Sequence, residues 1–233
     1  AGPPPAAPED GACYDLSFRQ ALAPTATRRP TPCDGPHTSE TYAVGTLDTV
    51  VDGHLLAVDA ERVQAQVADA CPEALPAFVG GDQEALRLSM IRPVWFTPSV
   101  AQSDRGADWY RCDVVVVAGD ETLAEPTSTL KGALDKQALR DRYAMCGTAA
   151  PDAERFERVI CAAEHTWRAI QVVPYESRTY PGEDAVRARL EAPCENAGLD
   201  AADDPLDYEW GYEYPTKEQW DMGQTYGLCW APD

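Results

Sequence analysis

The chain has 233 residues, a hydrophobic content of 44% and a formal net charge of −20 at pH 7. This composition can build hydrophobic cores, which argues against global disorder, and the length suits two modest domains. The negative charge repels phosphate backbones, and the longest basic run is Arg28-Arg29, so we expect no nucleic acid among the partners.

The N-terminal segment consists of Ala, Gly and Pro only over residues 1–8. Such a segment cannot pack a core, so we expect residues 1–10 to form a flexible tether. The chain begins with Ala1 instead of Met and has no apolar run long enough to span a bilayer. We therefore expect a secreted or extracytoplasmic protein, membrane-anchored in its precursor by an N-terminal segment that has been removed.

The eight cysteines are even in number and stand 15 to 41 residues apart, with no C-x-x-C pair. Zinc sites and redox motifs usually place two thiolates within two to four residues. The spacing therefore favours disulfides and an oxidising compartment, and it predicts neither a metal nor a cofactor.

An internal repeat begins with Cys33-Asp-Gly-Pro-His37-Thr38, which recurs as Cys161-Ala-Ala-Glu-His165-Thr166. A strand-like run follows each copy, over residues 41–44 and 169–173. A helical stretch that carries the third cysteine of each copy comes next. Its apolar residues are four apart and share one buried face, at Val63, Val67 and Cys71 in one copy and Val186, Leu190 and Cys194 in the other.

The helix starts carry acids suited to an N-cap or a first turn, at Asp59 and at Glu183-Asp184. The end of the repeat is its most regular part. Its Pro, Asp, Gly and Cys recur with identical spacing, as Pro98, Asp104, Gly106 and Cys112 and then as Pro215, Asp221, Gly223 and Cys229.

These matches predict an α+β fold of two homologous disulfide-stapled repeats, each a small antiparallel sheet with one helix. We expect repeat 1 over residues 11–118, a linking segment over residues 119–139 and repeat 2 over residues 140–233. Leucines at near-helical spacing predict a linking helix within residues 127–143, capped by Ser128 or Thr129.

Homologous repeats should share one disulfide connectivity, although four cysteines allow three pairings within each repeat. We favour pairings in which the first two cysteines flank a hairpin and the helix is joined to the last strand. These pairs are Cys13–Cys33, Cys71–Cys112, Cys146–Cys161 and Cys194–Cys229.

Several motifs in order make the chain resemble the actinobacterial septum formation family of envelope proteins over roughly residues 11–231. They include Cys33-Asp-Gly-Pro-His37-Thr-Ser-Glu40, Trp109-Tyr-Arg-Cys112, His165-Thr-Trp-Arg168 and the closing segment from Trp220 to Trp230. The resemblance implies an extracytoplasmic, lipoprotein-like or membrane-tethered module associated with septation. It carries over no catalytic residues.

His37 and Glu40 could form a general acid–base pair or half of a metal site. The second repeat keeps His165 but has Arg168 where the first has Glu40, and a cation cannot bind a metal. The alternative is structural, with each histidine hydrogen-bonded to local backbone beside its disulfide, assisted by Thr38 and Thr166.

Aromatic residues are dense from Tyr208 to Trp230, and carboxylates lie among them. Ring faces stack on sugars and carboxylates accept hydroxyl hydrogen bonds, which would suit a glycan; packing of the rings in a core is the alternative. The candidate ligand-binding residues are Trp210, Tyr212, Tyr214, Trp220, His37 and His165.

The chain has no G-x-S-x-G, H-E-x-x-H, Walker or dinucleotide motif. We therefore expect a non-enzymatic binding or scaffold module of the cell envelope, whose partner is an envelope protein or a cell-wall glycan. The alternatives are a secreted hydrolase that uses His37 and Glu40, and a peptidoglycan-binding protein that uses the C-terminal aromatic cluster.

Overall fold

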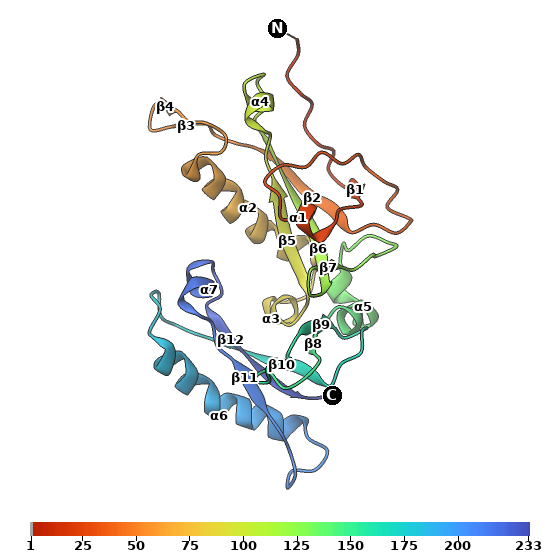
Figure 1. Ribbon diagram of the computed structural model, residues 1–233, viewed down its shortest axis with the longest axis vertical. Helices are drawn as coiled ribbons and strands as arrows, with labels where there is room; N and C mark the ends of the chain where they lie inside the picture. Colours follow the sequence, from red (N-terminus) through yellow and green to blue (C-terminus); the bar gives the residue numbers. More distant parts are fainter. Residues whose placement is uncertain (1) are drawn as a thin grey trace. The chain divides into compact units, whose positions relative to one another are not determined.

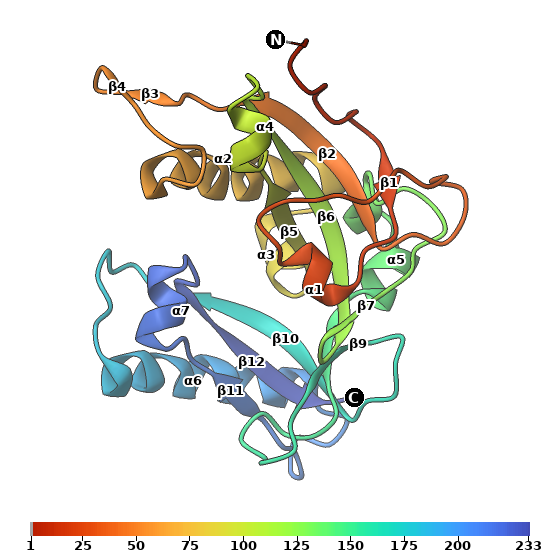
Figure 2. The ribbon, with the colours of Figure 1, turned by 45° about the horizontal axis from the view of Figure 1, so that its top comes forward.

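The computed structural model describes residues 2–233, and the chain divides into two compact units (Figures 1 and 2). The first unit comprises residues 2–82, 91–117 and 121–136, and the second comprises residues 83–90, 118–120 and 137–233. These bounds differ from the expected ones in two places. Residues 83–90 group with the second unit, and most of the expected linking segment groups with the first.

The first unit contains a sheet, one long helix and several short elements. They are β1 (Cys13–Tyr14), α1 (Phe18–Ala21), β2 (Ser39–Thr46), β3 (Val50–Val51), β4 (His54–Leu55), α2 (Glu61–Val79), β5 (Ile91–Phe96), α4 (Val100–Ser103), β6 (Trp109–Gly119), β7 (Thr122–Leu123) and η1 (Ala133–Asp135).

The second unit has the same general content. Its elements are α3 (Gln83–Arg87), α5 (Gln137–Arg142), β8 (Met145–Gly147), β9 (Arg158–Ile160), β10 (Trp167–Pro174), α6 (Glu183–Ala201), β11 (Gly211–Glu213), α7 (Lys217–Asp221) and β12 (Tyr226–Pro232).

The sheet of the first unit has the order β1-β2-β6-β5, with β7 added beside β6. Helix α2 packs on β2 and β5 and runs along one face of the sheet (Figure 2). Its buried side chains recur every four residues, at Val63, Val67, Cys71, Leu75 and Val79. The predicted helix face is therefore the one that is buried.

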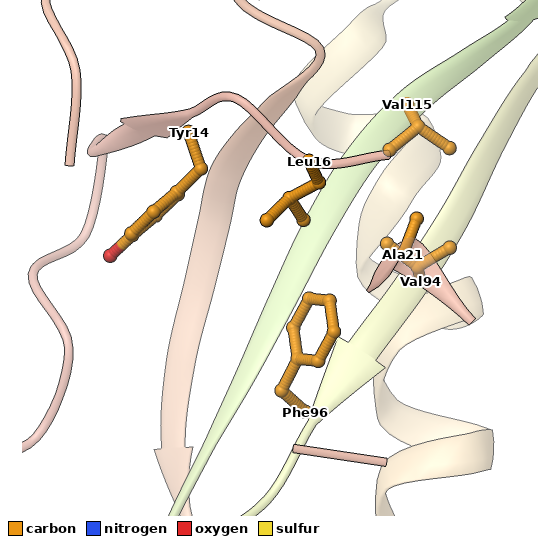
Figure 3. Close-up of a cluster of buried hydrophobic side chains, with 6 residues drawn as sticks. All are labelled: Tyr14, Leu16, Ala21, Val94, Phe96 and Val115. Atoms are coloured by element: carbon orange, nitrogen blue, oxygen red, sulfur yellow. The ribbon is translucent and has the colours of Figure 1, made fainter. Parts of the chain in front are cut away.

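The opposite face of this sheet carries a second apolar cluster, formed by Tyr14, Leu16, Ala21, Val94, Phe96 and Val115 (Figure 3). The loop between the first two cysteines supplies three of these side chains and the sheet supplies the others. The first unit therefore has three layers, with α2 on one face of the sheet and the loop that contains α1 on the other.

The sheet of the second unit has the order β11-β12-β10-β8-β9. Helix α6 packs on β10, β11 and β12 (Figure 2). Its core on this face consists of Val173, Leu190, Cys194, Ala197 and Cys229. On the other face, Phe156 from the loop before β9 contacts Trp230 edge to face, with ring centroids 5.2 Å apart.

The strand registers confirm that the units are repeats of one fold. Cys13 faces Glu40 across β1 and β2, as Cys146 faces Arg168 across β8 and β10. Both units then interrupt the ladder at the equivalent point, between Thr41 and Ala43 in one and between Ala169 and Gln171 in the other. Shared irregularities of register are a stronger sign of duplication than a shared strand order.

The identical spacing at the end of each repeat encodes a short capped helix followed by a tight turn. Ser99 and Gln102 form a capping box on α4, and Thr216 and Gln219 form one on α7. The glycine that follows each helix, Gly106 or Gly223, has a positive φ, of 92° and 102° respectively. Glycine adopts this conformation without steric cost, which explains its fixed place in the spacing.

Each unit contains two disulfides, and no described cysteine is free. Two of them, Cys13–Cys33 and Cys146–Cys161, join the first strand of a repeat to the segment before its histidine. The other two, Cys71–Cys112 and Cys194–Cys229, join the long helix to the last long strand. These are the pairs that the repeat favoured.

Two local expectations were wrong. The linking helix within residues 127–143 is instead the turn η1 and the short helix α5, separated by an extended Lys136 and preceded by Gly132 in the left-handed region. Neither conformation continues an α-helix. The N-cap of α2 is Ala60 and not Asp59, although Glu61 does supply a first-turn acid.

Candidate binding groove

His37 and Glu40, the candidate acid–base pair, are buried, with 1% and 5% of their surface exposed. The Glu40 carboxylate accepts hydrogen bonds from the Thr129 hydroxyl at 2.5 Å and from the Leu130 backbone N–H at 2.8 Å. His37 Nδ1 lies 2.9 Å from the Gly35 carbonyl oxygen and must donate to it. Both side chains are thus engaged with neighbouring loops of the first unit.

The histidine of the second unit makes the same local contact. His165 Nδ1 lies 2.7 Å from the Ala163 carbonyl oxygen, two residues earlier in the chain, as in the first unit. The threonine that follows donates to a carbonyl oxygen in each unit, from Thr38 to Leu16 at 2.8 Å and from Thr166 to Thr148 at 3.0 Å. These bonds give the recurring Cys-x-x-x-His-Thr motif a structural reason.

Removing the Glu40 carboxylate should destabilise the first unit. We expect Glu40→Ala to lower the free energy of unfolding by about 2 kcal/mol, because the buried Leu130 N–H loses its acceptor. Arg168 is the matched position in the second unit and is partly exposed, so Arg168→Ala should cost under about 1 kcal/mol. Urea unfolding would measure both. An unchanged stability in Glu40→Ala would contradict the structural role.

A possible metal site exists on geometry alone in the second unit, where ligand atoms of Cys146, His165 and Asp233 lie within 4.8 Å of one another. The Cys146 sulfur is bonded to Cys161 and offers no thiolate. The Asp233 carboxylate also lies 3.5 Å from the Arg168 guanidinium, which competes with a cation. These three residues therefore do not form a metal centre.

Three of the candidate aromatic residues come together at the edge of the second sheet. Trp210, Tyr212 and Tyr214 alternate along the extended segment that contains β11, so their rings share the face that α6 covers. Their ring centroids are 6.1 Å apart for the first pair and 6.3 Å for the second. All three side chains are half-buried and pack against the core beneath α6.

Trp220 is separate from this row. It is 6% exposed and packs against Tyr175 and Tyr180, with ring centroids 5.6 Å and 5.7 Å from its own. The aromatic region is therefore partly core and partly surface, and the two interpretations of the sequence apply to different residues.

A groove of about 500 Å³ follows the outer edge of β11. Residues 210–214 form its floor, Arg187 from the first turns of α6 forms one side, and Pro151 with Asp152 forms the other. Two glycines allow this close packing. A Cβ atom on Gly198 would lie 2.5 Å from the Trp210 Cβ, and one on Gly211 would lie 2.7 Å from the Pro151 ring.

Carboxylates outnumber cations around the groove. Glu213 is paired with Arg158 at 2.8 Å, and Glu183 is paired with Arg187 at 2.9 Å. Two further acids act on the Tyr212 hydroxyl, whose pKa is raised first by burial and then by Glu191, with a smaller contribution from Asp152. The groove is therefore aromatic along its floor, with the Arg187 guanidinium on one side and the Asp152 carboxylate on the other.

The first unit has a groove at the equivalent place, with a volume of about 300 Å³. Its floor is Pro93, Val94 and Trp95 of β5, and the register places Trp95 opposite Cys112 as Tyr212 lies opposite Cys229. Gln64 occupies the position of Arg187 on the long helix, and residues 21–24 take the place of Pro151 and Asp152. This groove is mainly apolar.

Comparison with known families agrees with this duplicated architecture. A family model described as Septum formation matches residues 5–99 and, separately, residues 92–229. The chain belongs to the septum formation family. The two tandem matches support two copies of one unit in this septum formation protein, and membership suggests a septation-related role. Searches of curated proteins and of solved structures gave no match.

The location of this septum formation protein follows in part from its chemistry. Four disulfides, together with a septum-formation domain, suggest an extracytoplasmic protein. None of the helices within residues 2–233 combines the length and the apolar character needed to cross a membrane.

The sequence indicated the aromatic row of the groove but missed its sides. Arg187, Pro151 and Asp152 lie in no motif, and only the fold brings them to β11. One signal was available, because the aligned cysteines place Tyr212 at the position of Trp95. His37 and His165 do not line the groove. A ligand-binding role for either histidine, as for the aromatic row, stays a prediction.

Proposed function

We propose that the protein is a non-enzymatic binding module that acts outside the cytoplasm in septation and holds an envelope protein in the β11 groove. The observation that carries this proposal is the recurrence of the groove. In both units a groove follows the edge strand of the sheet. The long helix lies on one side of the groove, and the loop between the first two cysteines of the repeat lies on the other. Concave surfaces lined by apolar and aromatic side chains are typical of binding sites.

The hydrolase alternative has less support. A general base must reach a substrate, but His37 and Glu40 are buried and are hydrogen-bonded to backbone and to Thr129. A base and a nucleophile within hydrogen-bond distance in an open cleft would have favoured an enzyme.

A cell-wall glycan is a second candidate ligand for the same groove. Half-buried rings at Trp210, Tyr212 and Tyr214 beside carboxylates would suit sugar stacking. The charge of −20 weighs against this ligand wherever the wall polymer is itself anionic.

Site-specific cross-linking tests the proposal. A photoreactive phenylalanine analogue replaces Tyr212 in the full chain, and the protein is irradiated in its native envelope. We expect a protein adduct at position 212 and none when the analogue replaces exposed Lys217, because only the first position lines the groove. The same substitution at Trp95 tests the smaller groove.

Cosedimentation with purified cell walls separates the two ligands. Wall binding that is lost in Tyr212→Ala, without any protein adduct at position 212, would replace the protein partner with a glycan. The absence of both a protein adduct and wall binding would contradict the binding function itself.

A further inference from the structure

The edge strands β5 and β11 differ in their ability to pair with another strand. Proline has no N–H, and within a sheet it is placed on an edge strand with its nitrogen facing away from the neighbouring strand. Pro93 lies in the middle of β5, so β5 is protected against a further strand. The register places Trp210 at the equivalent position of the second unit, and β11 contains no proline.

The same register shows which backbone groups of β11 face outward. In a strand, alternate residues direct N–H and C=O to the same edge. If the nitrogen of Pro93 faces away from β6, Trp95 shares that orientation, and so does Tyr212 at the equivalent position. A Cβ atom on Gly227 of β12 would lie 3.1 Å from the Glu213 carbonyl oxygen, which places that oxygen toward β12. Tyr212 therefore presents its N–H and C=O to the groove.

We infer that β11 receives an extended segment of the partner protein as an added strand, paired through the backbone of Tyr212. This inference rests on the proposed binding function and specifies its ligand. Edge-strand addition uses main-chain hydrogen bonds for affinity and side-chain contacts of period two for specificity.

The two sides of the groove define the side chains of that segment. On the α6 side, the row of Trp210, Tyr212 and Tyr214 offers an apolar and aromatic surface. On the other side, Asp152 and the paired Glu213 present carboxylates. The groove thus matches a segment that alternates apolar or aromatic residues with Lys or Arg.

The test begins with a displayed library of random twelve-residue peptides, selected on the full chain with all disulfides intact. We expect selected peptides to alternate aromatic and basic residues. Each is then synthesised with N-methyl groups on its odd or its even amides. An added strand pairs through one set only, so N-methylation of that set should weaken binding about tenfold or more while the other set is tolerated.

Two variants of the full chain separate the backbone from the ring. Tyr212→Ala removes the ring and keeps the N–H, and it should weaken peptide binding moderately. Tyr212→Pro also removes the N–H, and it should weaken binding about tenfold further. Trp95→Ala in the first unit serves as the matched control and should leave binding unchanged.

Each outcome has a distinct meaning. Peptides that bind in the groove but tolerate N-methylation of either set, or that are proline-rich, would overturn strand addition and leave the binding function in place. Failure to select any peptide, together with no adduct at position 212, would overturn both proposals.

Discussion

Replacing Cys71 and Cys112 together with alanine is expected to lower the free energy of unfolding of the first unit by about 4 kcal/mol. This disulfide closes a loop of 41 residues and joins α2 to β6 through two fully buried side chains. Cross-linking a loop of this length removes chain entropy from the unfolded state on the scale of about 4 kcal/mol. The loss of α2 from the sheet would also expose the apolar core beneath it.

The matched control is the pair Cys146→Ala and Cys161→Ala, which opens a loop of only 15 residues. Chain entropy predicts a smaller loss for this pair, of about 3 kcal/mol. Hydrogen exchange of α2 and α6, followed by mass spectrometry in urea, would report each unit separately. Equal protection of α2 with and without the Cys71–Cys112 bridge would show that packing alone holds the helix.

The second large effect is expected at Asp113, which is completely buried. Its carboxylate accepts from the Ser39 and Thr41 hydroxyls at 2.5 Å and 2.7 Å and from Arg111 through two bonds of 2.7 Å and 2.8 Å. Removing one partner of a buried ion pair leaves the other charge unpaired, at a cost of about 3–5 kcal/mol. We expect Asp113→Ala to destabilise the first unit by that amount, as measured by urea unfolding.

A double variant distinguishes the ion pair from the cavity that alanine creates. Arg111 also stacks on Tyr14 and Phe96, with its guanidinium carbon 3.8 Å and 4.6 Å from the ring centroids. Arg111→Met with Asp113→Leu keeps apolar volume and removes both charges, so its loss should be smaller than that of Asp113→Ala alone. The single variants Arg111→Met and Asp113→Leu complete the cycle. A loss of stability in the double variant equal to the sum of these two single losses would show that the two charges are not coupled.

In the second unit, apolar residues occupy the positions of this charged pair. The register puts Leu228 at the position of Arg111 and Trp230 at the position of Asp113. The hydroxyl of Thr41 is likewise replaced by the side chain of Ala169. One polar network has thus been exchanged for a cluster in which Trp230 contacts Phe156.

The sequence predicted those parts of the fold that leave a periodic or repeated trace. Buried positions four apart identified α2 and α6, and aligned cysteines identified two repeats whose helix and last long strand are joined by sulfur. The hairpin of β3 and β4 was not predicted, because its only sequence signal is the two-residue turn Asp52-Gly53. Both residues have a positive φ, as a tight hairpin turn requires.

The groove was the least predictable feature because its sides are far apart in the sequence. Strands β9 and β10 and helix α6 separate Asp152 from Tyr212 in the sequence, and no spacing rule connects the two residues. The buried network of Arg111 and Asp113 was equally hidden, since a charged pair two residues apart on a strand usually faces solvent. Only the strand register and the burial of both side chains reveal its role.

The exchange between the charged set at Arg111 and Asp113 and the apolar set at Leu228 and Trp230 constrains how the two copies diverged. Whichever set came first, replacing one of these residues alone would leave a charge or a hydroxyl unpaired in the interior, which destabilises the fold. Each of the two disulfides in a copy stabilises the fold by about 3–4 kcal/mol, which is on the scale of that loss. The disulfides therefore reduce the dependence of each copy on any one set of interior contacts.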